Sequence, residues 1–593
     1  MRVLSCSNLS VALYFGLCLG VVSCSGNETE VNPSVNPDPV VEDDGTSGHN
    51  FSATSEAADS TFAANRVLDV QVTIAEEDWN VLRFEHRKPV EFFGEGCRDP
   101  IPDAFNYYPA EVSIDGTSLG QVGVRTKGLV GSINPARPSL KVKLQEYQDE
   151  NYYQDRKRFT FNNQTSDQAR LSTCMAYYIF RQMGVPASRC NFAKMTVNEY
   201  PLGVYANVEP IKKPMLQRLF GDDSGNLYEG TVSDIRTGFS GRVEKKTNED
   251  ENDWSDFEAL LAAVEAPDDE FIERIGEVLD VDAFLRFTAA SVLVGHWDSF
   301  SGNANNYYFY HDPGTQKFYF LPWGPDDTFS NRNLAPNGRI QAAMGGSLLA
   351  RRLFEDSVIM TRYRDIMWSM LNELWDDDTI MGELDRMEAL VADHVVGMDE
   401  STHRSNVQAV RDFLTDRKRL LLNAINADPI PFTEPLPEDL LCLQYSGDMN
   451  VTFESQWGSL GAENPFSTGS GTFEADYGFI NFDAQALGVA MGEIGSPGAT
   501  EIDFIALIQD GQFMFVRLML PTSAIEANST FEMGDPRVSS LVILITEGEG
   551  FQIFGFLSEG TLTFGDEVEL SSGGTVRGEL SVGIWGGLPA VED

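Results

Sequence analysis

Four prolines fall within ten residues in the second half of the chain and divide the sequence into two unlike parts. Proline has no amide hydrogen and stops a helix, so the stretch ADPIPFTEPLPEDL predicts an extended linker over residues 428–440. Before it, helical and strand periods alternate over residues 61–427; after it, only short alternating runs follow. Because 593 residues are too many for one ordinary domain, we expect two compact units joined by this linker.

Residues 441–593 have the pattern of an all-β domain. Short alternating runs such as GTFEADYGFINF, QFMFVRLML and GELSVGIW are separated by Gly, Ser, Asn and Asp. This spacing predicts an antiparallel β-sandwich. No stretch in it has a helical period, and residue types typical of catalysis do not gather there.

The beginning of the chain looks like an export signal. MRVLSCSNLSVALYFGLCLGVVSC has one Arg, an apolar stretch and then Val-Val-Ser-Cys, which resembles a bacterial lipoprotein signal over residues 1–23 with Cys24 as the lipidated residue. An ordinary secretory signal or a membrane helix are the alternatives, although the stretch is short for a span. Residues 24–60 are rich in Asn, Pro, Ser, Gly and acid, which predicts a disordered tether. We therefore expect an exported protein, anchored by its lipid in the cell envelope or at the cell surface.

Charge and cysteine content narrow the partners and the compartment. The chain has 90 Asp and Glu against 43 Lys and Arg, which argues against nucleic acid and fits either cations and basic substrates or a surface adapted to salt. Beyond Cys24 there are four cysteines, an even number that an oxidising compartment allows to pair in three ways: Cys97, Cys174, Cys190 and Cys442. None has the spacing of a zinc site.

Two polar clusters flank a predicted aromatic hairpin. YYFYHDPGTQKFYFLPW, residues 307–323, reads as two strands around a Pro-Gly turn. Asp298 and three asparagines precede it, and Asp326 with Asp327 follow it. Since a hairpin brings its two ends together, we expect these side chains to form one site. The helical run before Asp298, VDAFLRFTAASVLVGHW, is expected to begin at Asp280 or Asp282 as a cap.

Several ordered stretches of the first part resemble the CotH kinase family, named after a spore coat protein. The resemblance covers roughly residues 65–426 and includes VGVRTKGLVGSINPARPSLKVKL, FTFNNQTSDQARLSTCMAYYIFRQMGVP, MTVNEYPLGVYANVEPI, LDVDAFLRFTAASVLVGHWD and NNYYFYHDPGTQKFYFLPWGPDDTF. It implies an α+β fold of atypical protein-kinase type. It also implies transfer of phosphate from ATP, with Mg²⁺ or Mn²⁺, to Ser or Thr of a secreted or surface protein. We expect this substrate protein to be Ser-rich and basic, because the acidic surface of the chain would attract a basic partner.

On the phosphate side, the resemblance assigns cations and one buried acid. The loop RTKGLVGS offers Arg125 and Lys127 beside backbone donors, and the strand SLKVKL offers Lys141 or Lys143 on one face. The family's Ser-x-Lys strand favours Lys141. Glu209 takes the family's Glu position after the Val-Tyr strand, where it is expected to hold the lysine or the nucleotide. The alternative for Glu209 is a structural ion pair at the end of the strand.

On the metal side, the resemblance assigns Asp298 as the base that positions the acceptor hydroxyl. Asn303 and Asn306 are expected to support a metal, Asp326 to be its principal ligand, and Asn305 to be a turn residue only. One departure is plain: the family commonly reads Pro-Trp-Asp-x-Asp, and here Gly324 replaces the first Asp. Asp327 is the candidate substitute. The alternative function is therefore a catalytically degenerate surface protein that acts as a binding or adhesion module, and the sequence leaves enzymatic activity and oligomeric state open.

Overall fold

The structure is a computed structural model of the whole chain. It describes residues 60–94, 96–129, 132–330, 340–427, 430, 436–437, 440, 442–478, 480–495, 497–509, 512–546 and 550–586. The predicted signal (1–23), Cys24, the tether up to residue 59 and most of the predicted linker lie outside these ranges. Within the described ranges, no helix has both the length and the apolar character needed to cross a membrane.

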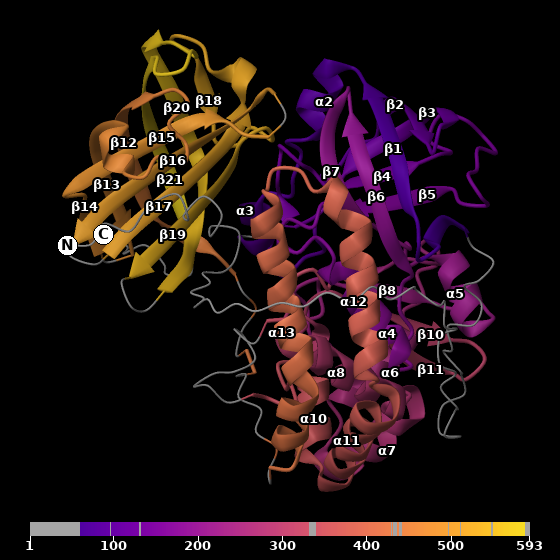
Figure 1. The fold of residues 1–593 in the computed structure, drawn as a ribbon. Helices are drawn as coiled ribbons and strands as arrows, with labels where there is room; N and C mark the ends of the chain where they lie inside the picture. The colour runs from indigo at the N-terminus through magenta and orange to yellow at the C-terminus, as the bar shows by residue number, and fades with distance from the viewer. Residues whose placement is uncertain are drawn as a thin grey trace, which may run out of the picture.

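A closed seven-stranded barrel forms the first part of the structure (Figure 1). Alternation in VLDVQVTI turns Val70 and Val72 inward and leaves Gln71 exposed, and β1 closes the barrel by pairing antiparallel with β2 and parallel with β6. The elements are β1 (Val67–Ile74), α2 (Glu76–Leu82), α3 (Pro89–Phe93), β2 (Tyr108–Ile114), β3 (Thr117–Thr126), β4 (Leu140–Lys143), β5 (Arg158–Asn162), α4 (Ser172–Gln182), β6 (Cys190–Val197) and β7 (Tyr200–Val208).

A four-stranded sheet packed among helices forms the second part, with strand order β11-β10-β8-β9. The predicted hairpin is confirmed: Tyr307 lies opposite Pro322 and Asp312 opposite Lys317. Its aromatic rings stack into the main core. The elements are α5 (Lys213–Phe220), β8 (Leu227–Gly230), β9 (Val243–Lys245), α6 (Ser255–Val264), α7 (Asp268–Val278), α8 (Val281–Val294), α9 (Phe300–Asn303), β10 (Tyr307–Asp312), β11 (Lys317–Pro322), α10 (Leu348–Glu355), α11 (Ser357–Ser369), α12 (Asp377–Val391) and α13 (Glu400–Ile425).

Helix α8 carries the polar segment of the predicted site at its C-terminal end. Asp280 is its cap, as expected, and accepts a hydrogen bond from the backbone N–H of Ala283 at 2.9 Å. Gly295 ends the helix in the left-handed conformation, with φ of 73°. The helix is buried on nearly all sides, so this end is held firmly where the chain turns toward β10.

The C-terminal part is one antiparallel sheet of ten strands (Figure 1, orange to yellow). Its path is β14-β13-β12-β21-β20-β19-β17-β16-β15, with β18 beside β20, and Trp457, just after β12, bridges to Met491 of β15. The antiparallel prediction is confirmed, but a sandwich of two sheets is not, since one continuous sheet encloses the core. The strands are β12 (Gln444–Gln456), β13 (Gly469–Tyr477), β14 (Ile480–Asp483), β15 (Ala486–Glu493), β16 (Ala499–Gln509), β17 (Gln512–Pro521), β18 (Thr530–Glu532), β19 (Ser539–Thr546), β20 (Gly550–Val568) and β21 (Thr575–Gly586).

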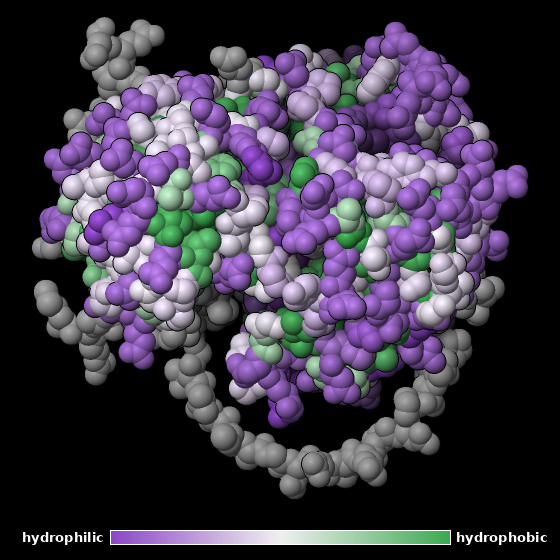
Figure 2. All heavy atoms as spheres, turned by 90° about the horizontal axis from the view of Figure 1, so that it is seen from above, coloured by the Kyte–Doolittle hydropathy of each residue, from purple (hydrophilic) through white to green (hydrophobic). Residues whose placement is uncertain are grey.

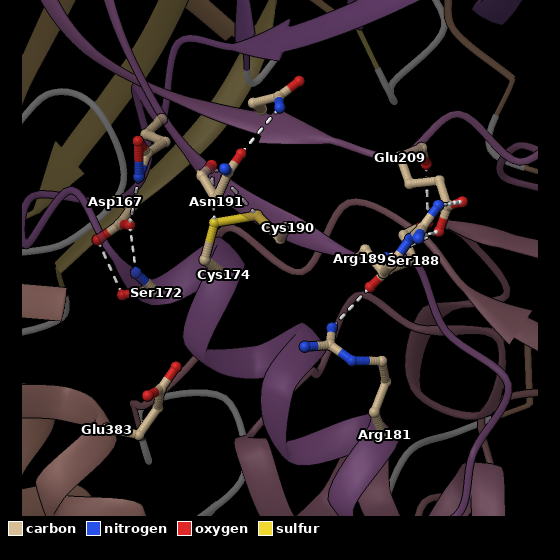
Figure 3. Close-up of a disulfide and its surroundings, with 12 residues drawn as sticks. Asp167, Ser172, Cys174, Arg181, Ser188, Arg189, Cys190, Asn191, Glu209 and Glu383 are labelled. Carbon is tan, nitrogen blue, oxygen red and sulfur yellow. Dashed lines mark hydrogen bonds and ion pairs between the residues drawn. A yellow bond between two sulfur atoms is a disulfide. The ribbon is translucent and has the colours of Figure 1, made fainter. Parts of the chain in front are cut away.

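The C-terminal sheet is fastened to the segment around α3. A disulfide joins Cys97 to Cys442, and the backbone N–H of Leu443 donates to the carbonyl of Phe93. An apolar cluster, called here the joint, surrounds these links; it contains Phe92, Phe93, Ile101, Leu443 and Phe556, with Val90, Leu129, Val232, Leu541 and Trp585 at its edge. The second disulfide, Cys174–Cys190, ties α4 to the start of β6 (Figure 3). Of the three possible pairings, this is the one formed.

Hydrophilic residues dominate the face seen in Figure 2, and apolar side chains reach it only in small groups. This agrees with the large acidic excess of the chain. A functional site is therefore expected among recessed charged side chains rather than on an apolar patch.

Candidate active site

The carboxylate of Asp298 is held by three asparagine side chains. The amide nitrogens of Asn303 and Asn306 donate to its two oxygens, each at 2.7 Å, and that of Asn305 donates to both at 3.1 and 3.2 Å. Desolvation nevertheless raises the pKa of Asp298 to about 6, because the three amide donors offset only part of it. Asp298 is therefore a fixed acid that changes charge close to neutral pH.

The loop after α8 owes its shape to two left-handed residues. Ala304 has φ of 47° and Asn306 has φ of 49°, so the chain reverses twice and presents the asparagines to Asp298. Asn305 was expected to be a turn residue only. That expectation is wrong, because its buried side chain also accepts a hydrogen bond from the backbone N–H of Val232 at 2.9 Å. The signal in the sequence was the third asparagine in one short loop.

The two ends of the hairpin meet, as the sequence predicts. The backbone N–H of Trp323 donates to the carbonyl of Asn306 at 3.1 Å, and Nε2 of His296 lies 3.1 Å from the carbonyl of Trp323. Burial lowers the pKa of His296 to about 4, so its ring is neutral near pH 7 and serves as a spacer between the two ends.

Asp326 and Asp327 follow this contact and differ in their surroundings. Asp327 accepts a hydrogen bond from Nε1 of Trp297 at 2.8 Å. Among the described residues, no side chain donates a hydrogen bond to Asp326, and desolvation, only partly offset by the charge of Lys127, raises its pKa to about 7. Asp326 is thus the carboxylate of this region that a cation would stabilise most.

A group of cations lies on the barrel, and one of them, Lys127, acts on the charge of Asp326. Arg125 and Lys141 are register partners on β3 and β4, and Lys127 lies just beyond β3 with its Nζ 5.8 Å from the ring centre of Trp323. Desolvation first, and then the charge of Arg125, lowers the pKa of Lys141 to about 7. Desolvation also lowers the pKa of Lys127. The acids Asp326 and Glu229 compensate these cations only in part, since the pKa of both lysines stays lowered, and three neighbouring cations are a suitable place for an anion.

The loop after Lys127 is compact. Gly128 has φ of 127°, and a Cβ placed there would lie 1.9 Å from Oγ of Ser132, so the position requires glycine. Lys143, the alternative to Lys141, pairs with Glu146 at 2.5 Å. The preference for Lys141 therefore agrees with the arrangement of charges, while Gly131 lies outside the described residues.

Glu209 does not hold Lys141. Its carboxylate is fully buried and binds three guanidinium groups, those of Arg189 and Arg218 at 2.6 Å each and that of Arg156 at 3.7 Å. Figure 3 shows Glu209 with Arg189. Burial by itself would raise the pKa of Glu209, but Arg218 and Arg189 lower it to about 2. Glu209 thus forms structural ion pairs, which was the alternative to a role in holding the lysine or the nucleotide.

Glu229 on β8, which was not predicted from the sequence, acts through its charge on both Lys127 and Lys141. Burial acts to raise its pKa, yet Lys246, 3.0 Å away, and Lys141 together lower it. Tyr308 of β10 also donates to it, and the register places Tyr308 directly opposite Glu229. Only the strand LYEG carried a signal for it, a charge in an otherwise apolar strand.

The residues fit a divalent ion only together with phosphate oxygens. Among the described residues, no three His, Cys, Asp or Glu side chains lie close enough to form a metal cage. Magnesium, however, is commonly held by one or two carboxylates, water and substrate phosphates, and Asp326 meets that requirement. Asn303 and Asn306 direct their amide nitrogens to Asp298, so only their carboxamide oxygens remain for a metal.

Phosphoryl transfer requires cations that bind the phosphates and a carboxylate that holds a metal ion. Lys127 and Lys141 of the barrel and Asp326 after the hairpin are residues of these types. The fold and this arrangement define a kinase-like protein. The chain belongs to the CotH kinase family, whose profile, described as CotH kinase protein, matches residues 124–421.

Two curated proteins are similar to the chain over part of their length. The inner spore coat protein H of Bacillus subtilis is 24% identical over 230 residues, which cover 36% of this chain and 62% of that protein. Invasin CotH7 of Rhizopus delemar is 22% identical over 249 residues, 39% of this chain and 41% of that protein. The chain thus spans less than two thirds of either relative. Among solved structures, the Helicobacter pylori proinflammatory kinase CtkA is similar to the chain with 12% identity and a TM-score of 0.26. The match covers 49% of this chain and 89% of the CtkA chain.

Proposed function

We propose that this protein is an ATP- and metal-dependent kinase that phosphorylates Ser or Thr of another protein. The observation that carries the proposal is the charge interaction of Lys127 with Asp326, together with Arg125 and Lys141 next to Lys127. Phosphate binding would relieve the repulsion among these cations, and a divalent ion would offset the charge of Asp326. Membership of the CotH kinase family supports the same reading.

The chain's own residues divide the work. Lys127 and Lys141 would bind phosphate oxygens, with Arg125 beside them and Glu229 orienting Lys141. Asp326, with Asp327 beside it, would hold Mg²⁺ or Mn²⁺, which supplies charge neutralisation when bound. Asp298 would accept the proton of the acceptor hydroxyl, and since its pKa is about 6 it is mostly ionised at pH 7 and above.

We also propose export, lipid anchoring at Cys24 and a basic, Ser-rich protein substrate. The two disulfides support an oxidising compartment, since such bonds are rare in cytosolic proteins. The net charge of −47 supports attraction of a basic partner.

A second candidate function is a non-catalytic surface module. Gly324 in place of the family's first Asp favours it, and one relative carries the name invasin. In this reading the kinase-like domain would no longer transfer phosphate, and it would bind or display a partner.

Nucleotide-dependent thermal unfolding of the full chain tests the proposal. ATP with Mg²⁺ or Mn²⁺ is expected to raise the unfolding temperature, because a ligand at a hundredfold excess over its Kd stabilises the folded state by ~2.7 kcal/mol. The increase should be lost in EDTA and in Asp326→Asn, and kept in Asp269→Asn, an exposed acid on α7. An unchanged unfolding temperature with every metal would favour the non-catalytic module.

A further inference from the structure

The joint between the two domains reaches both sides of the candidate active site. Leu129 and Val232 lie at its edge and pack against the cluster, which also contains Leu443 and Phe556 from the C-terminal part of the chain. Leu129 is two residues after Lys127, and Val232 is three residues after Glu229. A cluster that fastens one domain to the other therefore also touches the cation loop and the end of β8.

Val232 is in a strained conformation. Its φ is +45°, and for a β-branched residue a positive φ is a true outlier. Such strain persists only where surrounding contacts hold it. Three contacts do so here: the side chain packs in the joint, the N–H donates to Asn305 at 2.9 Å, and the carbonyl accepts from Nη1 of Arg242 at 3.1 Å.

Arg242 continues the connection toward the C-terminal sheet. Its side chain is fully buried, its Nη2 donates to the carbonyl of Phe92 at 3.0 Å, and its guanidinium lies 5.2 Å from the ring centre of Phe93. The carbonyl of Phe93 in turn accepts from the backbone of Leu443, next to Cys442. One continuous set of contacts thus runs from the disulfide Cys97–Cys442 through Arg242 and Val232 to Asn305.

Asn305 connects this set to the candidate base. Its Oδ1 is occupied by Val232, which fixes the amide so that its nitrogen faces both oxygens of Asp298. If Val232 moved, Asn305 would lose the partner that sets its orientation, and Asp298 would lose one of its three donors.

The cation loop is supported from the same domain at a second point. Gly495, in the turn after β15, approaches Ala136 so closely that an added Cβ would lie 2.6 Å from the Cβ of Ala136. Leu129 at one end of the loop and Ala136 near the other thus both meet the C-terminal domain.

We propose that docking of the C-terminal sheet through the joint positions the two halves of the active site, with Val232 and Leu129 as positioning residues. The catalytic role of Asp298 and Lys127 in this proposal rests on the proposed kinase function. The C-terminal domain then supports the active site from outside, since the site residues named above all come from the first domain.

Amide hydrogen exchange on the full chain tests the positioning without requiring activity. The double variant Cys97→Ser/Cys442→Ser and the single variant Phe556→Ala loosen the joint from its distant side. Peptides covering residues 231–235 and 298–306 are expected to exchange about tenfold faster, because exchange reports local opening.

Two matched variants serve as controls. Cys174→Ser/Cys190→Ser removes the other disulfide, and Phe482→Ala removes a buried phenylalanine of the C-terminal core away from the joint. Both should leave exchange at 298–306 unchanged. Should Phe556→Ala fail to fold, Leu541→Ala, which removes a partly exposed side chain, takes its place.

The proposal is overturned if faster exchange stays within residues 90–101 and 442–445, or if the controls accelerate residues 298–306 equally. A second readout applies if the wild-type chain transfers phosphate. Phe556→Ala should then weaken the hydrogen bond from Asn305 to Asp298 by loosening the joint. Because amide donors lower the pKa of Asp298, the acidic limb of the pH–rate profile should move to higher pH. Absence of transfer in the wild type would count against the kinase function and leave the exchange result standing.

Discussion

Gly324 lies so close to Asn306 that a Cβ on the glycine would stand 2.9 Å from Oδ1 of the asparagine. Gly324 also has φ of +55°, where side chains are disfavoured. The glycine that departs from the family pattern is thus favoured by the local structure of this chain. An aspartate restored at this position would have to displace Asn306, one of the donors that hold Asp298.

Replacing Gly324 by Ala should destabilise the protein more than the same change at an unhindered turn. Gly116 has φ of 76° and no atom near the added Cβ, so Gly116→Ala should cost only the backbone term, ~1 kcal/mol. Gly324→Ala adds the contact with Asn306, and we expect a further loss of ~1 kcal/mol or more. Thermal unfolding of the two variants side by side measures the difference. Equal losses would mean that Asn306 yields freely.

The raised pKa of Asp326 makes the free energy of unfolding depend on pH. An unfolded aspartate titrates near 3.9, whereas Asp326 titrates near 7, so between these values the folded state binds the extra proton and stability falls as pH rises. Asp326→Asn should therefore unfold at a higher temperature than the wild type at pH 8, with the gap closing toward pH 4. A gap that stays constant with pH would contradict this cause. Asp269→Asn is the matched control.

Glu209→Gln should unfold the protein far more readily, because it leaves Arg156, Arg189 and Arg218 without a buried counter-charge. Removing one partner of a buried ion pair typically costs ~3–5 kcal/mol. Glu209 has a pKa near 2, so its contribution is present above the unfolded value of about 4.3 and is lost as pH falls toward 2. Urea unfolding at pH 7 measures the loss, with Glu111→Gln, an exposed acid of β2, for comparison. A loss as small as that of the control would assign Glu209 a role other than structural.

Binding of ATP should add a proton to Lys141 near neutral pH. With a pKa near 7, this amine is about half protonated at pH 7, and a nearby phosphate favours the charged form. Calorimetric titration with ATP in excess Mg²⁺, in two buffers of different ionisation enthalpy, reports proton uptake. Lys141→Arg should reduce it, since arginine is already protonated. The same uptake in both proteins would mean that another group binds the phosphate.

Much of the local structure was predictable, because it depends on residues near one another in the chain. The alternation in residues 307–323 fixed the hairpin, and Asp280 marked the start of α8 through its own side chain. The hairpin in turn placed Asp298 near the contact between Asn306 and Trp323. For the same reason the asparagines of one short loop could be assigned to a single site.

Pairings between distant segments were decided by the tertiary structure. Glu229 is a charge within the apolar strand β8, and Glu209 directly follows the apolar strand β7. Only the packing of β8 beside β10, and of β7 in the barrel, determines which of the two acts on Lys141. The same holds for Cys97 with Cys442, 345 residues apart, and for the continuous C-terminal sheet.

The amino-acid sequence by itself determined the elements, their order, the family resemblance and the chemical types in the site. The tertiary structure alone decided the partner of each charge and the contact of Val232 with Asn305 and the joint. The physical reason is that periodicity and capping act over a few residues. Burial and ion pairing depend instead on where the whole chain brings segments that are hundreds of residues apart.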